Sequence, residues 1–183
     1  GFYENEGISP AGIVRAFWNN IRGGETQGAS TITQQYARNA YLTQEQTLSR
    51  KVKEAFLAIK LARSQTKEEV LEDYLNTIYF GRGAYGIQAA SQAYFGKDVQ
   101  DLSVAEGAVL AAIIRAPSSY DPDDGKEQKQ ALESRTLGYV IPGMVEQGWL
   151  AESEADAIKR LPTMKDPQAL NSYEGQTGFL LDM

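Results

Sequence analysis

The sequence predicts an all-α fold, and three observations support this prediction. Apolar residues recur at helical spacing along most of the chain. Two capping boxes, Thr66 with Glu69 and Ser103 with Glu106, mark the starts of helices. Only the last residues, 173–183, look more like the start of a strand or a linker. The 183 residues are enough for one domain with a substantial core.

The N-terminal part is expected to form three helices. Ser9-Pro10 starts the first, because serine caps a helix and proline suits its first turn. A polar, glycine-rich loop follows at 22–27, and then come helices at about 31–40, capped by Ser30, and at about 48–63. The residues expected to face inward are Ile13, Val14, Phe17, Trp18 and Ile21 in the first helix, Ile32 and Tyr36 in the second, and Leu48, Val52, Ala55, Phe56 and Ile59 in the third.

The second half of the chain is also expected to be helical. The two capping boxes open helices at 67–79 and from 104 to just before Pro117, the second of them strongly apolar. A longer helix at about 127–147 is expected to kink at Pro142. The other expected elements are a turn at 80–86, a short helix at 87–94, a loop at 117–125 and a short helix at 153–160.

Composition excludes several classes of function. The net charge of −6 argues against a nucleic-acid-binding protein, which would usually be basic. The chain has neither cysteine nor histidine, which excludes disulfides, catalysis by those two residues, and metal sites with thiolate or imidazole ligands. Acid–base chemistry must therefore use Asp, Glu, Lys or Tyr.

The segment GASTITQQYARN, residues 28–39, is unusually polar for a helix. It carries hydrogen-bonding side chains where a core helix would carry Leu and Val. Gln34 and Arg38 are four residues apart, as are Gln35 and Asn39, so each pair lies on one helix face. A ligand-binding face and an ordinary exposed face are equally compatible with this segment taken alone.

The segment RKVKE places two cations, Arg50 and Lys51, one turn before Glu54. Such a cluster suits a phosphorylated ligand, since fixed cations stabilise phosphate charge. It is equally typical of a solvated helix face, where an Arg50–Glu54 pair contributes only ~0.3–0.5 kcal/mol. The two polar segments together predict a site for a phosphorylated, sugar-like ligand.

The turn GRGAYG, residues 81–86, matches the G-x-G-x-x-G pattern of dinucleotide-binding proteins. That fingerprint requires a strand before the first glycine, within a βαβ unit. The preceding segment VLEDYLNTIYF has the pattern of a capped amphipathic helix instead. We therefore do not expect a nucleotide site here.

Taken in order, several segments resemble the blocks of one family. They are FYENEG at the start, GASTITQQ, RKVKE, EDYLNTIYFGRGAYGIQAAS and LSVAEGAVLAAIIRAPSSYDP. Their order and spacing resemble those of peptidoglycan glycosyltransferases, the family 51 domains of bifunctional class A penicillin-binding proteins. The resemblance covers residues 1–160. It implies a lysozyme-like, bilobal helical domain, with a cleft between a larger lobe and a smaller, membrane-facing one.

The resemblance also implies roles for particular residues. The first block of the family carries a catalytic Glu, which is expected just upstream of Gly1, since Phe2 matches the Phe of that block; Asn5 stands where the family often has His. The later blocks imply substrate and pyrophosphate binding by Ser30, Thr31, Gln34, Gln35, Arg38 (often Lys in the family), Asn39, Arg50, Lys51 and Arg115, catalysis by Glu54, and shaping of the cleft by Asn76, Tyr79, Gly81 and Gly86.

The reaction that the family implies uses such groups. A growing glycan held by its lipid pyrophosphate is joined to the 4-hydroxyl of a lipid-linked disaccharide-peptide, lipid II. A carboxylate takes the proton from that hydroxyl as it attacks the anomeric carbon. Fixed cations stabilise the charge that the leaving pyrophosphate gains. A single displacement inverts the anomeric centre, which gives a β-1,4 linkage and releases undecaprenyl pyrophosphate.

Glu54 has three candidate roles in this scheme. Beside two cations it should stay ionised. It could orient Arg50 and Lys51, hold a divalent cation such as Mg or Mn at the pyrophosphate, or stabilise oxocarbenium-like charge. We favour the orienting role, and the metal is not identified by the sequence.

Partners and location follow from the same resemblance. The expected partners are lipid II, the growing strand, the membrane surface and a covalently attached transpeptidase domain, with no nucleic acid. Residues 1–170 are expected to form the glycosyltransferase domain and 171–183 the start of the linker. Phe17 and Trp18 are either core or a membrane-facing flap. The domain is expected at the outer face of the bacterial cytoplasmic membrane, anchored by an N-terminal helix outside this sequence.

Two alternatives from other functional classes stay open. A lysozyme-like muramidase or lytic transglycosylase would share the fold, but it has no use for the cations at Arg38, Arg50 and Lys51. A non-catalytic cell-wall-binding scaffold is the second alternative, because the Glu of the first block is not in the sequence.

Overall fold

The computed structural model describes residues 31–41 and 48–166, with the side chains of 48–52 excepted. The all-α prediction is confirmed for these residues, where the only β-pairing is an isolated bridge between Tyr79 and Tyr85. The chain forms two compact units, residues 1–78 and 79–183. The expected helix from Ser9-Pro10 and the expected strand or linker at 173–183 lie outside the described residues.

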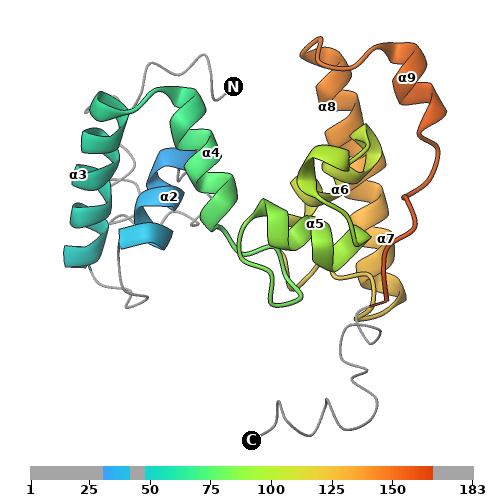
Figure 1. The fold of residues 1–183 in the computed structure, drawn as a ribbon, viewed down its shortest axis with the longest axis horizontal. Helices are drawn as coiled ribbons and strands as arrows, with labels where there is room; N and C mark the ends of the chain where they lie inside the picture. The colour runs from blue at the N-terminus through green and yellow to red at the C-terminus, as the bar shows by residue number, and fades with distance from the viewer. Residues whose placement is uncertain (1–30, 42–47, 167–183) are drawn as a thin grey trace, which may run out of the picture. The chain divides into compact units, whose positions relative to one another are not determined.

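Three helices make up the described part of the first unit: α2 (Ile32–Tyr41), α3 (Leu48–Ser64) and α4 (Lys67–Thr77). Helix α2 contacts both α3 and α4 (Figure 1). The core of this unit includes the buried residues Tyr36 and Ala37 from α2, Ala58 from α3, and Val70 and Tyr74 from α4. Tyr36 therefore faces inward as predicted, and the capping box of Thr66 with Glu69 is present as predicted.

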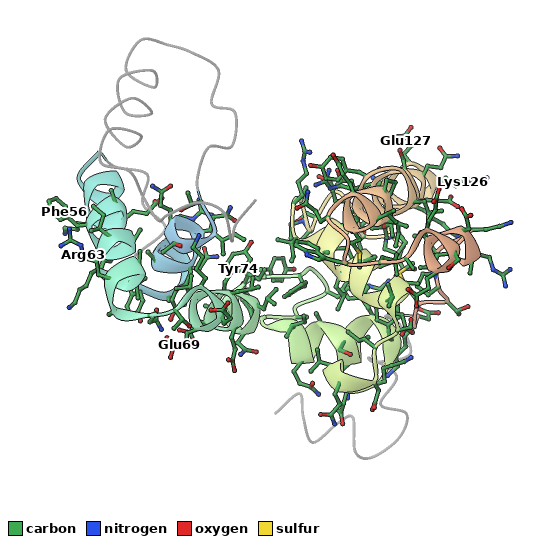
Figure 2. The ribbon with its side chains drawn as sticks, turned by 90° about the horizontal axis from the view of Figure 1, so that it is seen from above. Phe56, Arg63, Glu69, Tyr74, Lys126 and Glu127 are labelled. Atoms are coloured by element: carbon green, nitrogen blue, oxygen red, sulfur yellow. The ribbon has the colours of Figure 1, made fainter. Side chains whose placement is uncertain are left out.

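The predicted inward face of α3 is wrong at Phe56. This side chain is 72% exposed, whereas Glu54 and Ala58 are buried. Figure 2 shows Phe56 pointing away from α2 and α4. A helix turns about 200° over two residues, so Phe56 lies nearly opposite Glu54 and Ala58. Apolar residues recur all round α3, and apolar spacing alone therefore did not select the face with the small Ala58, where α2 can approach closely.

Two helix boundaries in this unit differ from expectation. Thr31, not Ser30, caps α2: its Oγ1 accepts from the Gln34 N–H at 3.2 Å, and Gln34 Oε1 accepts from the Thr31 N–H at 3.1 Å. Helix α4 ends at Thr77, two residues before the expected Tyr79. The chain is already extended at Ile78, because the next residue pairs with Tyr85 across the turn.

The second unit is built round α6 (Val104–Ile113). Its residues Val109, Leu110 and Ile113 are almost fully buried, as the strongly apolar pattern predicted. Around it lie α5 (Ile87–Phe95), the short 3₁₀ turn Val99–Asp101, α7 (Lys126–Arg135), the π-helical turn η2 (Thr136–Val140), α8 (Ile141–Glu146) and α9 (Glu152–Ala157) (Figure 1).

The helix expected at 127–147 is confirmed as a continuous helical segment from Lys126 to Glu146, made of α7, η2 and α8. Pro142 is at the start of α8, and the distortion that it causes lies one turn earlier, in the π-helical turn. Proline has no N–H, and its ring would meet the carbonyl four residues earlier, that of Gly138. The wider π turn is the way this chain relieves that conflict. Helix α9 is shorter than the predicted 153–160 and ends at Ala157.

Candidate functional site

The predicted site residues are divided between the two units. Ser30, Phe17 and Trp18 lie outside the described residues, and Arg50 and Lys51 are described only as part of the α3 backbone. The first unit holds Thr31, Gln34, Gln35, Arg38, Asn39, Glu54 and Asn76; the second holds Tyr79, Gly81, Gly86 and Arg115.

Helix α2 presents Gln35 and Arg38 toward α4. The Tyr74 hydroxyl donates to Gln35 Oε1 at 3.2 Å. Burial raises the pKa of Tyr74, and the positive charge of Arg38 opposes that rise, so the guanidinium lies within electrostatic reach of the phenol. Gln35 and Arg38 are half-buried and Asn39 is exposed. These helices therefore form a polar patch that is partly accessible to a ligand.

Thr31 and Gln34 are engaged locally. Their side chains cap the start of α2 reciprocally, as described above. Thr31 is exposed and Gln34 is half-buried, and each has further hydrogen-bonding capacity, because an amide and a hydroxyl each offer several donor and acceptor positions. Their immediate role is to begin the helix that carries Gln35 and Arg38.

Asp73 of α4 belongs to this patch and was missed by sequence reasoning. Its Oδ2 accepts from Gln65 Nε2 at 2.7 Å. The contact with the Tyr41 hydroxyl, burial and the Asp73 carboxylate together raise the pKa of Tyr36 well above its usual value. The carboxylate therefore faces the Tyr36 phenol across the α2–α4 contact. Only its place in the EDY sequence before the buried Tyr74 hinted at this.

Glu54 is the one predicted catalytic residue in the chain. Helix α3 is continuous across it, so Arg50 precedes it by one helical turn, as predicted. Its side chain is 1% exposed, although it is a carboxylate. Carboxylates are almost never fully buried unless they interact with other polar groups. An orienting role for Glu54 requires a carboxylate in a fixed position, and this burial fits that requirement.

The turn that contains Gly81 is a close approach of three segments. Gly81 has a φ of +88°, and a Cβ built there would lie 2.7 Å from the Tyr94 hydroxyl and 3.3 Å from the Pro117 carbonyl oxygen. The Tyr94 hydroxyl donates to the Phe80 carbonyl oxygen at 2.9 Å. Only glycine fits here, because the backbone has a positive φ and no space is left for a Cβ atom.

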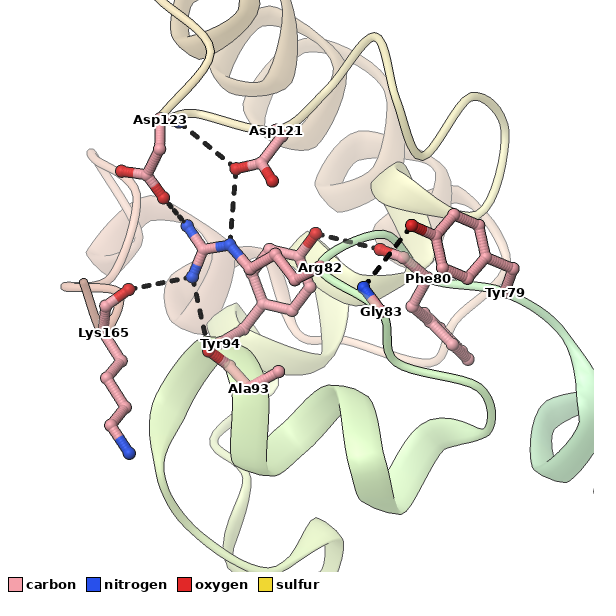
Figure 3. Close-up of polar contacts among 9 residues, drawn as sticks. All are labelled: Tyr79, Phe80, Arg82, Gly83, Ala93, Tyr94, Asp121, Asp123 and Lys165. Carbon is pink, nitrogen blue, oxygen red and sulfur yellow. Dashed lines mark hydrogen bonds and ion pairs between the residues drawn. The ribbon is translucent and has the colours of Figure 1, made fainter. Parts of the chain in front are cut away.

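Arg82, the next residue, contacts several segments that are distant in sequence, and it was not predicted as a site residue. Its Nε donates to Asp121 Oδ1 at 3.3 Å, Nη2 pairs with Asp123, and Nη1 donates to the carbonyl oxygens of Ala93 at 3.3 Å and Lys165 at 2.8 Å (Figure 3). The guanidinium also lies 4.3 Å from the centre of the Tyr94 ring. No local sequence pattern predicts these partners, which are 11 to 83 residues away in sequence.

Two other residues predicted to shape a cleft, Tyr79 and Gly86, flank the same turn, whereas Asn76 belongs to the first unit. Tyr79 is 37% exposed, and its ring lies tilted against that of Tyr85 with the ring centres 4.8 Å apart. Its hydroxyl accepts from the Gly83 N–H at 3.4 Å. Gly86, with a φ of +85°, caps α5. Helix α4, not a strand, precedes this turn, so the context for dinucleotide binding is missing, as predicted. Arg115 is exposed just beyond the end of α6.

Asp and Glu side chains are the candidate metal ligands in this chain, which has no Cys or His. Within residues 31–41 and 48–166, no group of three or more Asp or Glu side chains gathers in a way that could hold an ion. Asp121 and Asp123 are engaged by Arg82. A divalent cation bound jointly by Glu54 and a pyrophosphate stays a prediction.

Known proteins resemble this chain along most of its length. The sequence model of the family described as Transglycosylase matches residues 1–141. Penicillin-binding protein 1A of Aquifex aeolicus is 46% identical over 181 residues, which are 98% of this chain and 24% of that protein. Penicillin-binding protein 1F of Bacillus subtilis is 48% identical over 159 residues, 84% of this chain and 21% of that protein.

One solved structure is similar to part of this chain. The crystal structure of penicillin-binding protein 1A from Haemophilus influenzae matches 56% of this chain and 15% of that chain, with 34% identity and a TM-score of 0.49. The chain thus spans about a quarter or less of the length of the curated relatives that it matches.

Proposed function

We propose a function for this chain on the premise that it belongs to the Transglycosylase family, whose model matches residues 1–141. The chain is a peptidoglycan glycosyltransferase that polymerises lipid II into β-1,4-linked glycan strands and releases undecaprenyl pyrophosphate. The match over residues 1–141 is the observation that carries this proposal. Neither a muramidase nor a scaffold is favoured by the relatives reported above.

The geometry of the first unit supports a role in holding the pyrophosphate. Arg38 is half-buried beside Tyr74, and Arg50 precedes the buried Glu54 by one turn of α3. An arginine suits bidentate contact with phosphate oxygens better than a lysine does. In this proposal Glu54 orients Arg50 and Lys51, and these cations stabilise the charge that develops on the leaving pyrophosphate.

Other parts of the proposal depend on the longer protein. The carboxylate that takes the proton from the attacking hydroxyl is expected upstream of Gly1, and a transpeptidase domain is expected downstream. None of the helices within the described residues has the length and apolar character needed to cross a bilayer. We place the protein at the outer face of the cytoplasmic membrane, where lipid II is available, with Phe17 and Trp18 as candidates for contact with the bilayer.

Polymerisation of labelled lipid II by the full-length protein tests the proposal. Glu54→Gln and Lys51→Ala should each abolish most of the activity, because one removes the orienting charge and the other removes a phosphate-facing cation. The matched control is Lys60→Ala, which removes an exposed cation from the same helix and should polymerise like wild type. Wild-type turnover in both site variants, with folding unchanged, would refute the site assignment.

A further inference from the structure

We propose that Arg82 is a positioning residue for the polymerisation reaction. It fixes the segment that follows α6, residues 114–124, and thereby holds in place Arg115, to which the family resemblance assigns a phosphate-facing role. This inference rests on the function proposed above. Arg82 itself has no contact with substrate in this proposal and acts through the carboxylates of Asp121 and Asp123.

The first argument is the cost of placing an arginine at this position. Arg82 has a φ of +50°, the only positive value among non-glycine residues of the described chain. A left-handed backbone is unfavourable for a residue with a side chain, because Cβ lies too close to the following carbonyl oxygen. Glycines flank it on both sides, and its own side chain is 3% exposed. A strained, buried arginine persists only where its contacts compensate for the strain.

The second argument is the set of segments that the guanidinium joins. It contacts Tyr94 and the Ala93 carbonyl on α5, the Lys165 carbonyl near the end of the described chain, and Asp121 and Asp123 beyond α6 (Figure 3). A lysine offers a single point charge and could not serve these directions at once, whereas the planar fork of arginine can.

The third argument is the position of Arg115 between two anchors. On one side α6 ends at Ile113, whose carbonyl oxygen accepts from the Ala116 N–H at 3.1 Å. On the other side the Asp121 carboxylate accepts from Arg82, and also from the Asp123 N–H at 3.2 Å. Between them the backbone N–H groups of residues 119 and 120 both donate to the Ala116 carbonyl oxygen. Arg115 itself is exposed on this doubly fastened segment.

Electrostatics explain why Arg82 is needed at the second anchor. Burial raises the pKa of Asp123, Arg82 lowers it, and the charge of nearby Asp121 raises it again. Without the guanidinium the two carboxylates would repel each other, because no positive charge would lie between neighbouring negative charges. The segment would then move apart from the turn at 79–86, and Arg115 would lose its fixed position.

The test is a double-mutant cycle in the full-length protein, with kcat and KM measured on labelled lipid II. Arg82→Lys should lower kcat by about tenfold to a hundredfold with KM changed by less than about threefold, since misplacement of a catalytic group by about 1 Å has effects of that size. In an Arg115→Ala background the same change should lower kcat by less than about threefold, because the two residues act through one pathway.

Two further variants keep the result interpretable. Asp123→Asn removes one carboxylate while the Arg82–Asp121 pair stays, and it should show the same dependence on Arg115; it decides the question if Arg82→Lys does not fold. Arg135→Lys is the matched control, an arginine of the same unit 4.5 Å from the centre of the Tyr139 ring, and should polymerise like wild type.

The outcomes separate the two proposals. If the wild-type protein does not polymerise lipid II, the proposed function fails. If wild type polymerises but the effects of Arg82→Lys and Arg115→Ala simply multiply, Arg82 supports the fold alone and this inference is wrong. An equal loss of kcat in both backgrounds by Asp123→Asn would overturn it in the same way.

Discussion

Gly81→Ala should destabilise the second unit by about 2–4 kcal/mol, although it adds a single methyl group. The new Cβ would lie 2.7 Å from the Tyr94 hydroxyl, closer than such contacts occur in proteins. Tyr94 cannot easily move away, because its side chain is fully buried and the Arg82 guanidinium lies over its ring. We therefore expect the hydrogen bond from the Tyr94 hydroxyl to the Phe80 carbonyl oxygen to break.

The magnitude is the sum of three effects. An alanine in a left-handed backbone costs ~1–2 kcal/mol. Leaving the buried Phe80 carbonyl oxygen without its partner costs ~1–3 kcal/mol. Alanine also restricts the unfolded chain, which returns ~0.4–1 kcal/mol to the folded state. The central values of these ranges leave a net loss of roughly 3 kcal/mol, and we expect a measured loss of about 2–4 kcal/mol.

Gly83→Ala is the matched control in the same turn. Gly83 has a φ of +69°, but nothing lies within 4 Å of the position its Cβ would take. It shares the backbone cost without the collision, and it should lose only about 1 kcal/mol. Urea unfolding measures both, with Trp149 fluorescence as the probe in a Trp18→Phe background, since the chain has two tryptophans.

A third variant locates the cause. In a Tyr94→Phe background the offending hydroxyl is absent, so Gly81→Ala should cost about as much as Gly83→Ala does in wild type. Equal losses for Gly81→Ala and Gly83→Ala in the wild-type background would show that the collision with Tyr94 does not exist, and the reasoning would then be wrong.

Two further predictions concern titration and packing. Burial raises the pKa of Tyr94, so the folded state favours the neutral phenol. The free energy of unfolding should therefore fall as pH rises above about 10, where the unfolded tyrosine ionises. In urea unfolding at several pH values, the free energy of unfolding of the Tyr94→Phe variant should fall less steeply. A steeper fall in the variant would contradict this. Phe56→Ala should cost less than about 1 kcal/mol because Phe56 is exposed, whereas Ala58→Leu should cost about 1–3 kcal/mol by overpacking a buried site; the reverse order in urea unfolding would show that the face assigned to α3 is wrong.

Some features of this protein were readable from the sequence because their causes are local. The capping boxes at Thr66 and Ser103 involve residues three apart, and both are present. The apolar run of α6 predicted its central position, since a helix that is apolar all round must be buried. Long, specific blocks in a set order predicted the family, and the match over residues 1–141 confirmed it.

Boundaries were less readable, because neighbours outside the helix decide them. Helix α4 stops at Thr77 since Tyr79 pairs with Tyr85, and the cap of α2 falls one residue later than expected. The distortion before Pro142 was predicted, but its form, a π-helical turn, depends on how the chain relieves the conflict with the Gly138 carbonyl.

The sequence by itself determined the helical class, most of the helices, the family and the candidate residues of the site. Only the tertiary structure decided that Phe56 faces outward while Glu54 is buried, that Asp73 faces Tyr36, and that Arg82 joins segments up to 83 residues apart. The physical reason is that helical periodicity and capping act over a few residues, whereas burial and ion pairing depend on which distant surfaces meet.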